Sequence, residues 1–189
     1  METNMKKTVI RSIAMVLCLV VALTSMVACD LLGGKAKVKK VEIPAEALYE
    51  FAGIQNMVIE NSEELADETD TFTRMYTENH YVHYWDENLN MFEKIDTLLC
   101  KDSTITFIHY YGLGTASFSN GGRIYSDYEE TIHTLGTYSG TDVTIDKSVE
   151  ENKEFTDAYL TEDGFIICVE EVDSEGIVIK YELVFKAVA

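Results

Sequence analysis

The sequence predicts an all-β protein in which an antiparallel meander forms a barrel, with a two-sheet β-sandwich as the alternative. Short runs rich in Tyr, Phe, Ile, Val and Thr follow one another from residue 72 to the end of the chain, separated by polar turns. These turns recur about every 8–12 residues, a spacing typical of barrels and sandwiches. The chain has a single proline and no long heptad pattern, so we expect helices to contribute little to the fold.

The last predicted strand, 177–187, shows the two faces of such a sheet most clearly. Its apolar side chains recur with a period of two, at Ile177, Ile179, Tyr181, Leu183 and Phe185. Lys180, Glu182 and Lys186 fall on the opposite face. Alternation with one charged face indicates an antiparallel sheet that covers a core on its other side.

The region before the strand series is less regular. Residues 45–52 read as a short helical turn, because Pro44 is well placed at the start of a helix. A strand is expected over 49–60, and Gly53 interrupts its pattern. The polar, acidic segment 61–71 is either a long surface loop or a marginal helix that continues toward Met75.

Asn61 or Ser62 is the expected cap of that marginal helix, since Asn and Ser are favoured at helix N-termini. Beyond it we predict strands of β-branched and aromatic residues. Their ranges are 80–85, 90–100, 104–111, 115–118, 123–128, 131–135, 142–146, 154–160, 165–172 and 177–187.

The N-terminus has the layout of a secretory signal helix. Lys6, Lys7 and Arg11 form a positive region, and the apolar segment 13–23 follows them. A membrane-spanning helix needs about 20 apolar residues, and this run is shorter. We therefore expect residues 1–28 to be a signal peptide.

Met26-Val27-Ala28-Cys29 resembles a bacterial lipobox. The resemblance implies that the peptidase cuts before Cys29 and that a diacylglycerol is attached to its thiol, which anchors the chain on the outer side of the cell membrane. Stable anchoring requires more than one acyl chain, and a diacylglyceryl cysteine supplies at least two. The alternative is an ordinary signal peptide that is cleaved after Ala28 and leaves an unmodified cysteine.

The lipidated cysteine and a flexible linker then occupy residues 29–40, and one domain occupies 41–189. Residues 1–40 hold seven of the 15 basic and two of the 33 acidic residues, so 41–189 carries eight basic and 31 acidic residues, a net charge of −23. Such a field repels nucleic acid, which excludes that class of partner.

Two segments resemble the lipocalin-like domains of bacterial lipoproteins. The first runs from Phe118 to Gly122, and the second contains Gly136-Thr137-Tyr138 followed by a turn and a β-branched strand. Phe165 after an Asp-Gly turn and the pair Phe185-Lys186 fit the end of that pattern. The resemblance covers residues 104–189 well and implies a lipocalin-like barrel, but it carries over no binding residues.

The cysteines of the domain, Cys100 and Cys168, are a candidate disulfide, because the expected location permits oxidation. Each lies in an apolar strand-like run, so each can also be a small buried apolar residue. Sequence does not show whether their strands are neighbours.

The histidines indicate no metal centre. In a strand over 80–85, His80 and His83 lie on opposite faces and cannot share an ion. His109 and His133 have no ligand partners at the spacing of known metal motifs. We therefore expect neither a metal nor a cofactor.

The chain also shows no catalytic signature. It has neither a Gly-x-Ser-x-Gly elbow nor a Cys–His pair at a family spacing. Gly112-Leu113-Gly114 lacks the helix and lysine that a phosphate loop requires. We expect a protein that is not an enzyme.

Aromatic side chains are the one concentration of binding-type residues: Tyr81, Tyr84, Trp85, Tyr110 and Tyr111. Such residues fill β cores more often than they line a ligand cavity or stack on sugar rings. We expect a membrane-anchored lipoprotein that holds a small apolar or amphipathic ligand in the mouth of a barrel with an apolar cavity. The alternative is a cell-surface module without an enclosed ligand, which binds an envelope protein or glycan through an exposed aromatic patch.

Overall fold

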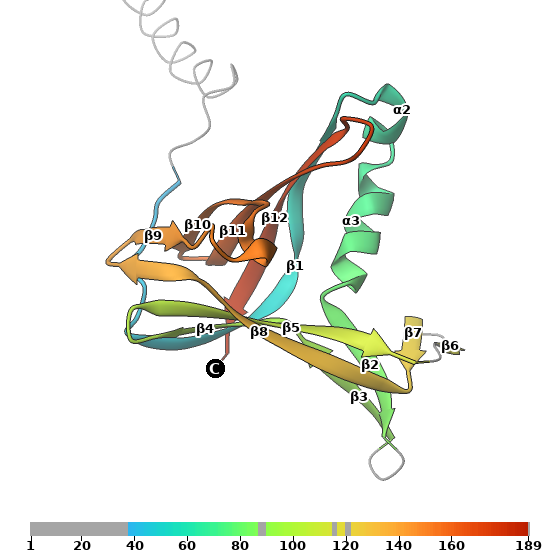
Figure 1. The fold of residues 1–189 in the computed structure, drawn as a ribbon, viewed down its shortest axis with the longest axis horizontal. Helices are drawn as coiled ribbons and strands as arrows, with labels where there is room; N and C mark the ends of the chain where they lie inside the picture. The colour runs from blue at the N-terminus through green and yellow to red at the C-terminus, as the bar shows by residue number, and fades with distance from the viewer. Residues whose placement is uncertain (1–37, 87–89, 115–116, 120–121, 189) are drawn as a thin grey trace, which may run out of the picture. The chain divides into compact units, whose positions relative to one another are not determined.

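The computed structural model describes residues 38–86, 90–114, 117–119 and 122–188 (Figure 1). The predicted signal peptide 1–28, the lipidation site Cys29 and most of the linker lie outside the described residues. Lys39–Ala189 forms a compact unit, and the architecture below is that of this unit.

Most of the described residues belong to strands. These are β1 (Glu46–Glu60), β2 (Tyr81–Asp86), β3 (Asn90–Ile95), β4 (Thr97–Lys101), β5 (Thr104–Leu113), β6 (Ser117–Ser119), β7 (Gly122–Tyr125), β8 (Asp127–Ser139), β9 (Asp142–Ile145), β10 (Phe155–Thr161), β11 (Gly164–Val172) and β12 (Val178–Ala187). The helices are α2 (Glu63–Ala66), α3 (Thr69–Glu78) and the 3-10 turn η1 (Glu150–Asn152). The prediction of an all-β fold is confirmed.

The larger sheet is an antiparallel meander of eight strands that nearly closes into a barrel. Its order is β10-β11-β12-β1-β4-β5-β8-β9, so each strand pairs with the next barrel strand along the chain. The last strand, β12, pairs with the first, β1, and the remaining gap lies between β9 and β10. The predicted antiparallel barrel is therefore confirmed.

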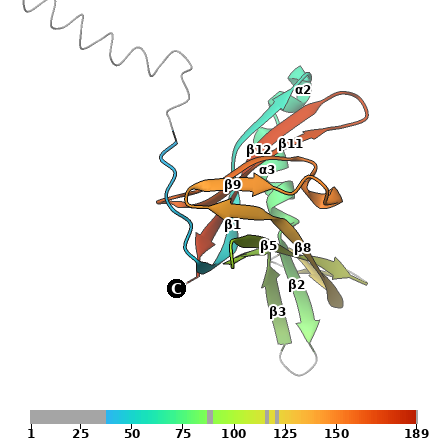
Figure 2. The ribbon, with the colours of Figure 1, turned by 60° about the vertical axis from the view of Figure 1, so that its left-hand side comes forward.

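The smaller sheet has the order β3-β2-β7-β6 and is built entirely from two insertions into the meander. The helices with β2 and β3 are inserted between β1 and β4, and β6 with β7 is inserted between β5 and β8. The two insertions meet where β2 pairs with β7 in parallel. In Figures 1 and 2, β2 and β3 form a hairpin beside β5 and β8, and Figure 1 shows α3 alongside β1.

A cluster of buried apolar side chains lies inside the barrel. The predicted inward face of β12 is confirmed, because Ile179, Tyr181, Leu183 and Phe185 are all buried. The ring of Phe185 packs edge-on against Phe51 and Phe107, with centroids 5.7 and 5.8 Å apart. At this level of the barrel, packed aromatic rings therefore occupy the interior, and the expected apolar ligand cavity stays a prediction.

The helical turn predicted over 45–52 is wrong. This segment begins β1, which is hydrogen-bonded on both sides, to β12 and to β4. Two flanking strands satisfy more backbone groups than one helical turn after Pro44 could. The break expected at Gly53 is present as a shift in the β1–β12 register.

The segment 61–71 forms helix, and Ser62 is its cap: the Ser62 hydroxyl accepts a hydrogen bond from the Leu65 amide at 3.3 Å. The partly buried side chains of Leu65, Phe72 and Tyr76 place α2 and α3 against the core. None of the helices in the described part of the chain is long and apolar enough to cross a membrane.

Cys100 and Cys168 do not form a disulfide, which corrects the candidate pairing. Cys100 lies in the core cluster on β4, whereas on β11 the core residues are Phe165, Ile167 and Val169. Cys168 alternates with these and faces the other side of the sheet. Burial raises the pKa of the Cys100 thiol to about 11, so it behaves as a small apolar residue.

Candidate functional site

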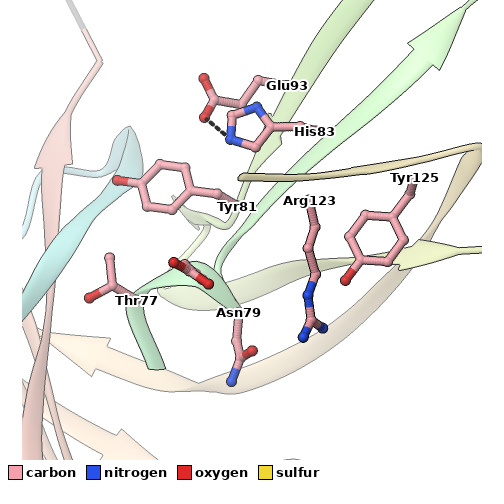
Figure 3. Close-up of a pocket in the computed structure, with 8 residues that line it drawn as sticks. Thr77, Asn79, Tyr81, His83, Glu93, Arg123 and Tyr125 are labelled. Carbon is pink, nitrogen blue, oxygen red and sulfur yellow. Dashed lines mark ion pairs between the residues drawn. The ribbon is translucent and has the colours of Figure 1, made fainter. Parts of the chain in front are cut away.

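An open pocket of about 280 Å³ lies on the smaller sheet, where the end of α3 meets β2, β3 and β7 (Figure 3). Thr77, Glu78 and Asn79 contribute from the last turn of α3 and its C-cap. The remaining lining residues come from strands: Tyr81, His83, Glu93, Arg123 and Tyr125. The pocket is thus formed where the two insertions meet.

Strand geometry explains how β2 and β3 supply this lining. Tyr81 and His83 are two residues apart on β2 and share a face of the sheet. Glu93 is the cross-strand partner of His83, and its Oε1 lies 3.6 Å from His83 Nε2. Arg123 and Tyr125 are added by β7, which lies beside β2 only because the distant insertion returns there.

The pocket combines ring faces with charged groups of both signs. In Figure 3 the Tyr81 and Tyr125 rings lie to either side of Arg123, and the His83–Glu93 pair lies on the far side of Tyr81 from Thr77. The Tyr81 hydroxyl donates a hydrogen bond to the Phe51 carbonyl at 3.2 Å. Burial, with a smaller effect of Glu93, raises the pKa of Tyr81, so this ring stays neutral and fixed in position.

Of the five aromatics predicted as ligand contacts, only Tyr81 lines this pocket. The Tyr84 and Tyr110 rings pack on Tyr128, at centroid distances of 4.6 and 5.9 Å. Lys94 Nζ lies 5.2 Å from the centre of the Tyr128 ring. These rings pack at the junction between the smaller sheet and the barrel. They therefore fill a core and do not line the pocket.

The other two predicted aromatics lie elsewhere. Tyr111 stacks on His109 with a centroid distance of 6.2 Å. Trp85 is 52% exposed, and so is Met91, its partner across the β2–β3 ladder. Trp85 is the only exposed aromatic side chain among the described residues. The exposed aromatic patch expected for an interaction module is therefore limited, in this part of the chain, to the Trp85–Met91 pair.

Sequence reasoning missed four pocket residues that matter chemically: His83, Glu93, Arg123 and Tyr125. The alternation along β2 could have placed His83 on the same face as Tyr81. No local pattern indicates that β7, about 40 residues further along, pairs in parallel with β2.

A second group of side chains surrounds Asp96, whose side chain is 0% exposed. Its Oδ2 atom lies 2.7 Å from His80 Nδ1 and 2.6 Å from His109 Nδ1. Its Oδ1 atom accepts a hydrogen bond from the Tyr110 amide at 2.9 Å. We call His80, Asp96 and His109 the His-Asp-His cluster.

Three segments bring this cluster together. His80 ends the turn after α3 and lies against the Phe51 ring, 4.3 Å between centroids. Asp96 lies between β3 and β4, where its own amide bonds to the His80 carbonyl and its carbonyl accepts from the Phe51 amide. His109 comes from β5. The expectation that His109 has no ligand partner is wrong: two imidazole nitrogens and one carboxylate oxygen within 4.8 Å of one another can hold a metal ion.

His133 lies in the same region of the molecule, with its ring 5.3 Å from that of Phe107. Neither of its ring nitrogens has a hydrogen-bond partner among the described residues, nor has Asn152 Oδ1. Burial lowers the pKa of His133 from 6.5, against a weaker opposing effect of the Glu151 carboxylate. The folded protein therefore favours a neutral ring here.

Comparison of the chain with protein-family models, with curated proteins and with solved structures finds no match.

Proposed function

We propose that this chain is a lipid-anchored binding protein on the outer side of the cell membrane, and that a small amphipathic ligand occupies the pocket on the smaller sheet. The anchoring rests on the signal sequence and on the lipobox resemblance at Cys29. The binding rests on one observation, the convergence of two tyrosine rings and Arg123 at an open pocket of about 280 Å³.

The lining favours an amphipathic ligand over a wholly apolar one. The Tyr81 and Tyr125 rings offer apolar faces, and Arg123 and Glu93 offer a hydrogen-bond donor and an acceptor of opposite charge. A strongly acidic domain disfavours a ligand with net negative charge. A small neutral molecule with one apolar face and several hydroxyl or carbonyl groups, such as a single sugar ring, meets these conditions.

The packing of the barrel also supports this choice. A lipocalin-like carrier of an apolar molecule would need an enclosed cavity, whereas the Phe51 and Phe107 rings both pack against Phe185 inside the barrel. The lipocalin resemblance therefore supports the barrel architecture alone. The proposed binding site lies instead in the two insertions that form the smaller sheet.

Native mass spectrometry of the full-length chain, purified in detergent from its own membranes, tests the ligand. We expect a small molecule that leaves on denaturation, and at least about tenfold less of it in Arg123→Ala, because a charge-assisted hydrogen bond contributes about 1.5–3 kcal/mol. Lys153→Ala is the matched control, since this exposed lysine pairs with Glu150 away from the pocket. A bare mass for the wild-type protein would contradict the proposal.

The anchor has its own test, which is independent of the ligand. Cys29→Ala should move the protein from the membrane fraction to the soluble fraction, and the mass of the mature wild-type N-terminus should show a diacylglyceryl group. Cys100→Ala is the control, because its buried thiol lies in the core. A mature wild-type chain with an unmodified N-terminal cysteine would support the ordinary signal peptide instead.

The exposed Trp85–Met91 pair favours a second candidate function, a surface module that binds an envelope protein or glycan. Both side chains are 52% exposed and lie next to each other across the β2–β3 ladder. Tryptophan is enriched among the residues that contribute most to binding at protein interfaces. This function predicts a partner captured by cross-linking in the intact envelope that is lost in Trp85→Ala and retained in Arg123→Ala.

A further inference from the structure

We propose that His80, Asp96 and His109 form a binding site for a zinc ion. This site is separate from the pocket on the smaller sheet and does not depend on the function proposed for that pocket.

The geometry of the donor atoms is the first argument. The two Nδ1 atoms and the Asp96 Oδ2 atom all lie within 4.8 Å of one another. A tetrahedral zinc ion with bonds of about 2.0–2.2 Å holds its ligand atoms roughly 3.4 Å apart. The present separations of 2.7 and 2.6 Å are those of hydrogen bonds. Each Nδ1 atom therefore has to move away from Asp96 Oδ2 by less than about 1 Å, so that the zinc ion can replace the proton of each hydrogen bond.

The burial of Asp96 is the second argument. Its side chain is 0% exposed, and in the described part of the chain the only ion-pairing groups on it are the two histidines. A buried carboxylate is stable only when it is paired or coordinates a metal. Zinc bound by two neutral imidazoles would supply the positive charge that no lysine or arginine supplies here.

The supporting contacts are the third argument. The Asp96 Oδ1 atom is held by the Tyr110 amide at 2.9 Å, and the His80 ring is held by Phe51. Ligand side chains that are oriented in this way by a second set of contacts are typical of metal sites. The His109 side chain is 34% exposed and that of His80 is 13% exposed, so an ion can enter from the His109 side and keep a water as its fourth ligand.

The donor types select the class of metal. Calcium and magnesium prefer sites made of oxygen atoms, whereas imidazole suits zinc, copper, iron and nickel. Zinc has no geometric preference from its d electrons and accepts two nitrogens with one carboxylate oxygen. We therefore assign the site to zinc.

Metal binding would also join three parts of the chain. His80 belongs to the inserted segment after α3, Asp96 to the connection between β3 and β4, and His109 to the barrel strand β5. Because the unfolded chain lacks the assembled site, zinc should stabilise the folded protein and fasten the smaller sheet to the barrel.

The experiment uses the full-length chain in detergent, stripped of metal and then dialysed against zinc. We expect one zinc per chain by elemental analysis and a higher unfolding temperature with zinc than without it. Losing a residue that only orients a metal ligand weakens binding about 10–100-fold. His80→Gln and His109→Gln each remove a ligand, so each should weaken zinc binding by more than that. His83→Gln is the matched control, because this histidine lies three residues from His80 and pairs with Glu93 instead.

A wild-type protein that binds no zinc would overturn the proposal, and the cluster would then be a purely hydrogen-bonded one. Equal losses in His83→Gln and His80→Gln would overturn it as well. X-ray absorption of the zinc-loaded wild-type protein requires no variant. Its spectrum should show two imidazole ligands on the zinc ion, and any other set of ligands would contradict the assignment.

Discussion

Asp96 shows how much one buried side chain can organise. Through its carboxylate and its backbone it contacts His80, Phe51, His109 and Tyr110, which come from three separate segments of the chain, since His109 and Tyr110 are neighbours on β5. Removing one partner of a buried charge leaves the other uncompensated and costs several kcal/mol. The position therefore matters for stability whether or not a metal is bound.

His133 leads to a prediction about pH. Burial lowers the pKa of His133 from 6.5, so as the pH falls below this value the unfolded chain takes up a proton that the folded protein still resists. The free energy of unfolding should therefore decrease as the pH falls from 7 to 5, and His133→Leu should remove that part of the decrease. Urea unfolding of both proteins at the two pH values measures it. If the two proteins had the same pH dependence, the loss of stability at low pH could not be attributed to His133.

Gly136 illustrates a different constraint, the close approach of two strands. A Cβ atom at this buried position on β8 would collide with the backbone oxygen of Thr144 on β9. We expect Gly136→Ala to destabilise the protein by about 1–3 kcal/mol, as overpacking does. The control is Thr137→Ala at the next, exposed residue, which should cost less than about 1 kcal/mol. Equal effects in chemical denaturation would show that β9 moves away freely.

At the scale of elements, α3 depends on its contacts with the barrel. Its N-cap, Glu68, makes no side-chain capping bond, and its last turn contains no basic residue. Tyr76 on α3 donates a hydrogen bond to Glu171 on β11 at 3.1 Å, and Tyr181 on β12 donates to the same carboxylate. The Tyr76 and Tyr181 rings also meet edge-on, with centroids 5.3 Å apart. The carboxylate of Glu171 thus fastens the helix to two barrel strands.

Tyr76→Phe should loosen α3 without unfolding the barrel. We expect a loss of about 1–2 kcal/mol, because a partly buried hydrogen bond to a charged acceptor is removed. Amide hydrogen exchange should become faster over Thr69–Glu78 and stay unchanged in β11 and β12. Tyr111→Phe is the control, since its bond to Glu129 is exposed to solvent. Uniformly faster exchange would show that α3 and the barrel unfold as one unit.

The same tyrosine gives a prediction at alkaline pH. Burial, with smaller effects of Glu171 and other acids, raises the pKa of Tyr76 to about 12. The unfolded chain releases this proton near pH 10, so the contribution to stability is complete below pH 10 and is lost as the pH rises toward 12. Tyr76→Phe should therefore be less sensitive to alkali than the wild type when unfolding is followed by circular dichroism. Equal loss of stability in the two proteins would contradict a raised pKa of Tyr76 in the folded protein.

At the scale of the whole molecule, stability comes from the packed interior of the barrel. Phe185 is fully buried and lies against Phe51 and Phe107, which belong to β1 and β5. These rings link the first, middle and last strands of the meander. The gap between β9 and β10 is accordingly tolerated, since the strands on either side of it share a core instead of a hydrogen-bonded ladder.

Phe185→Ala should destabilise the full-length protein by about 3–5 kcal/mol, which is the cost of replacing a buried phenylalanine and leaving a cavity. Val172→Ala, at an exposed residue of β11, should change stability by less than about 0.5 kcal/mol. Urea unfolding measures both variants. A small effect of Phe185→Ala would mean that the interior is loosely packed, and the case for an enclosed ligand cavity would return.

Local sequence patterns were enough to predict the fold class and the buried face of individual strands. A period of two decides which side chains share a face, so the buried residues of β12 could be predicted from their alternation. Ser62 could be predicted as a cap because capping depends on a few adjacent residues. The signal peptide and the lipidation site at Cys29 also rest on local patterns, and they stay predictions.

The positions of the candidate sites, in contrast, depend on how distant strands pair. Alternation along a strand shows which face a side chain lies on, but it does not identify the neighbouring strand. It could therefore show on which face of β2 Tyr81 lies, but not that Arg123 from β7 lines the same pocket. The segment 45–52 became strand because β4 and β12 flank it, which no local preference reveals. The His-Asp-His cluster depends on three segments whose separation along the chain carries no metal-motif spacing. Contacts between distant residues follow from strand order and register, and these are properties of the whole sheet.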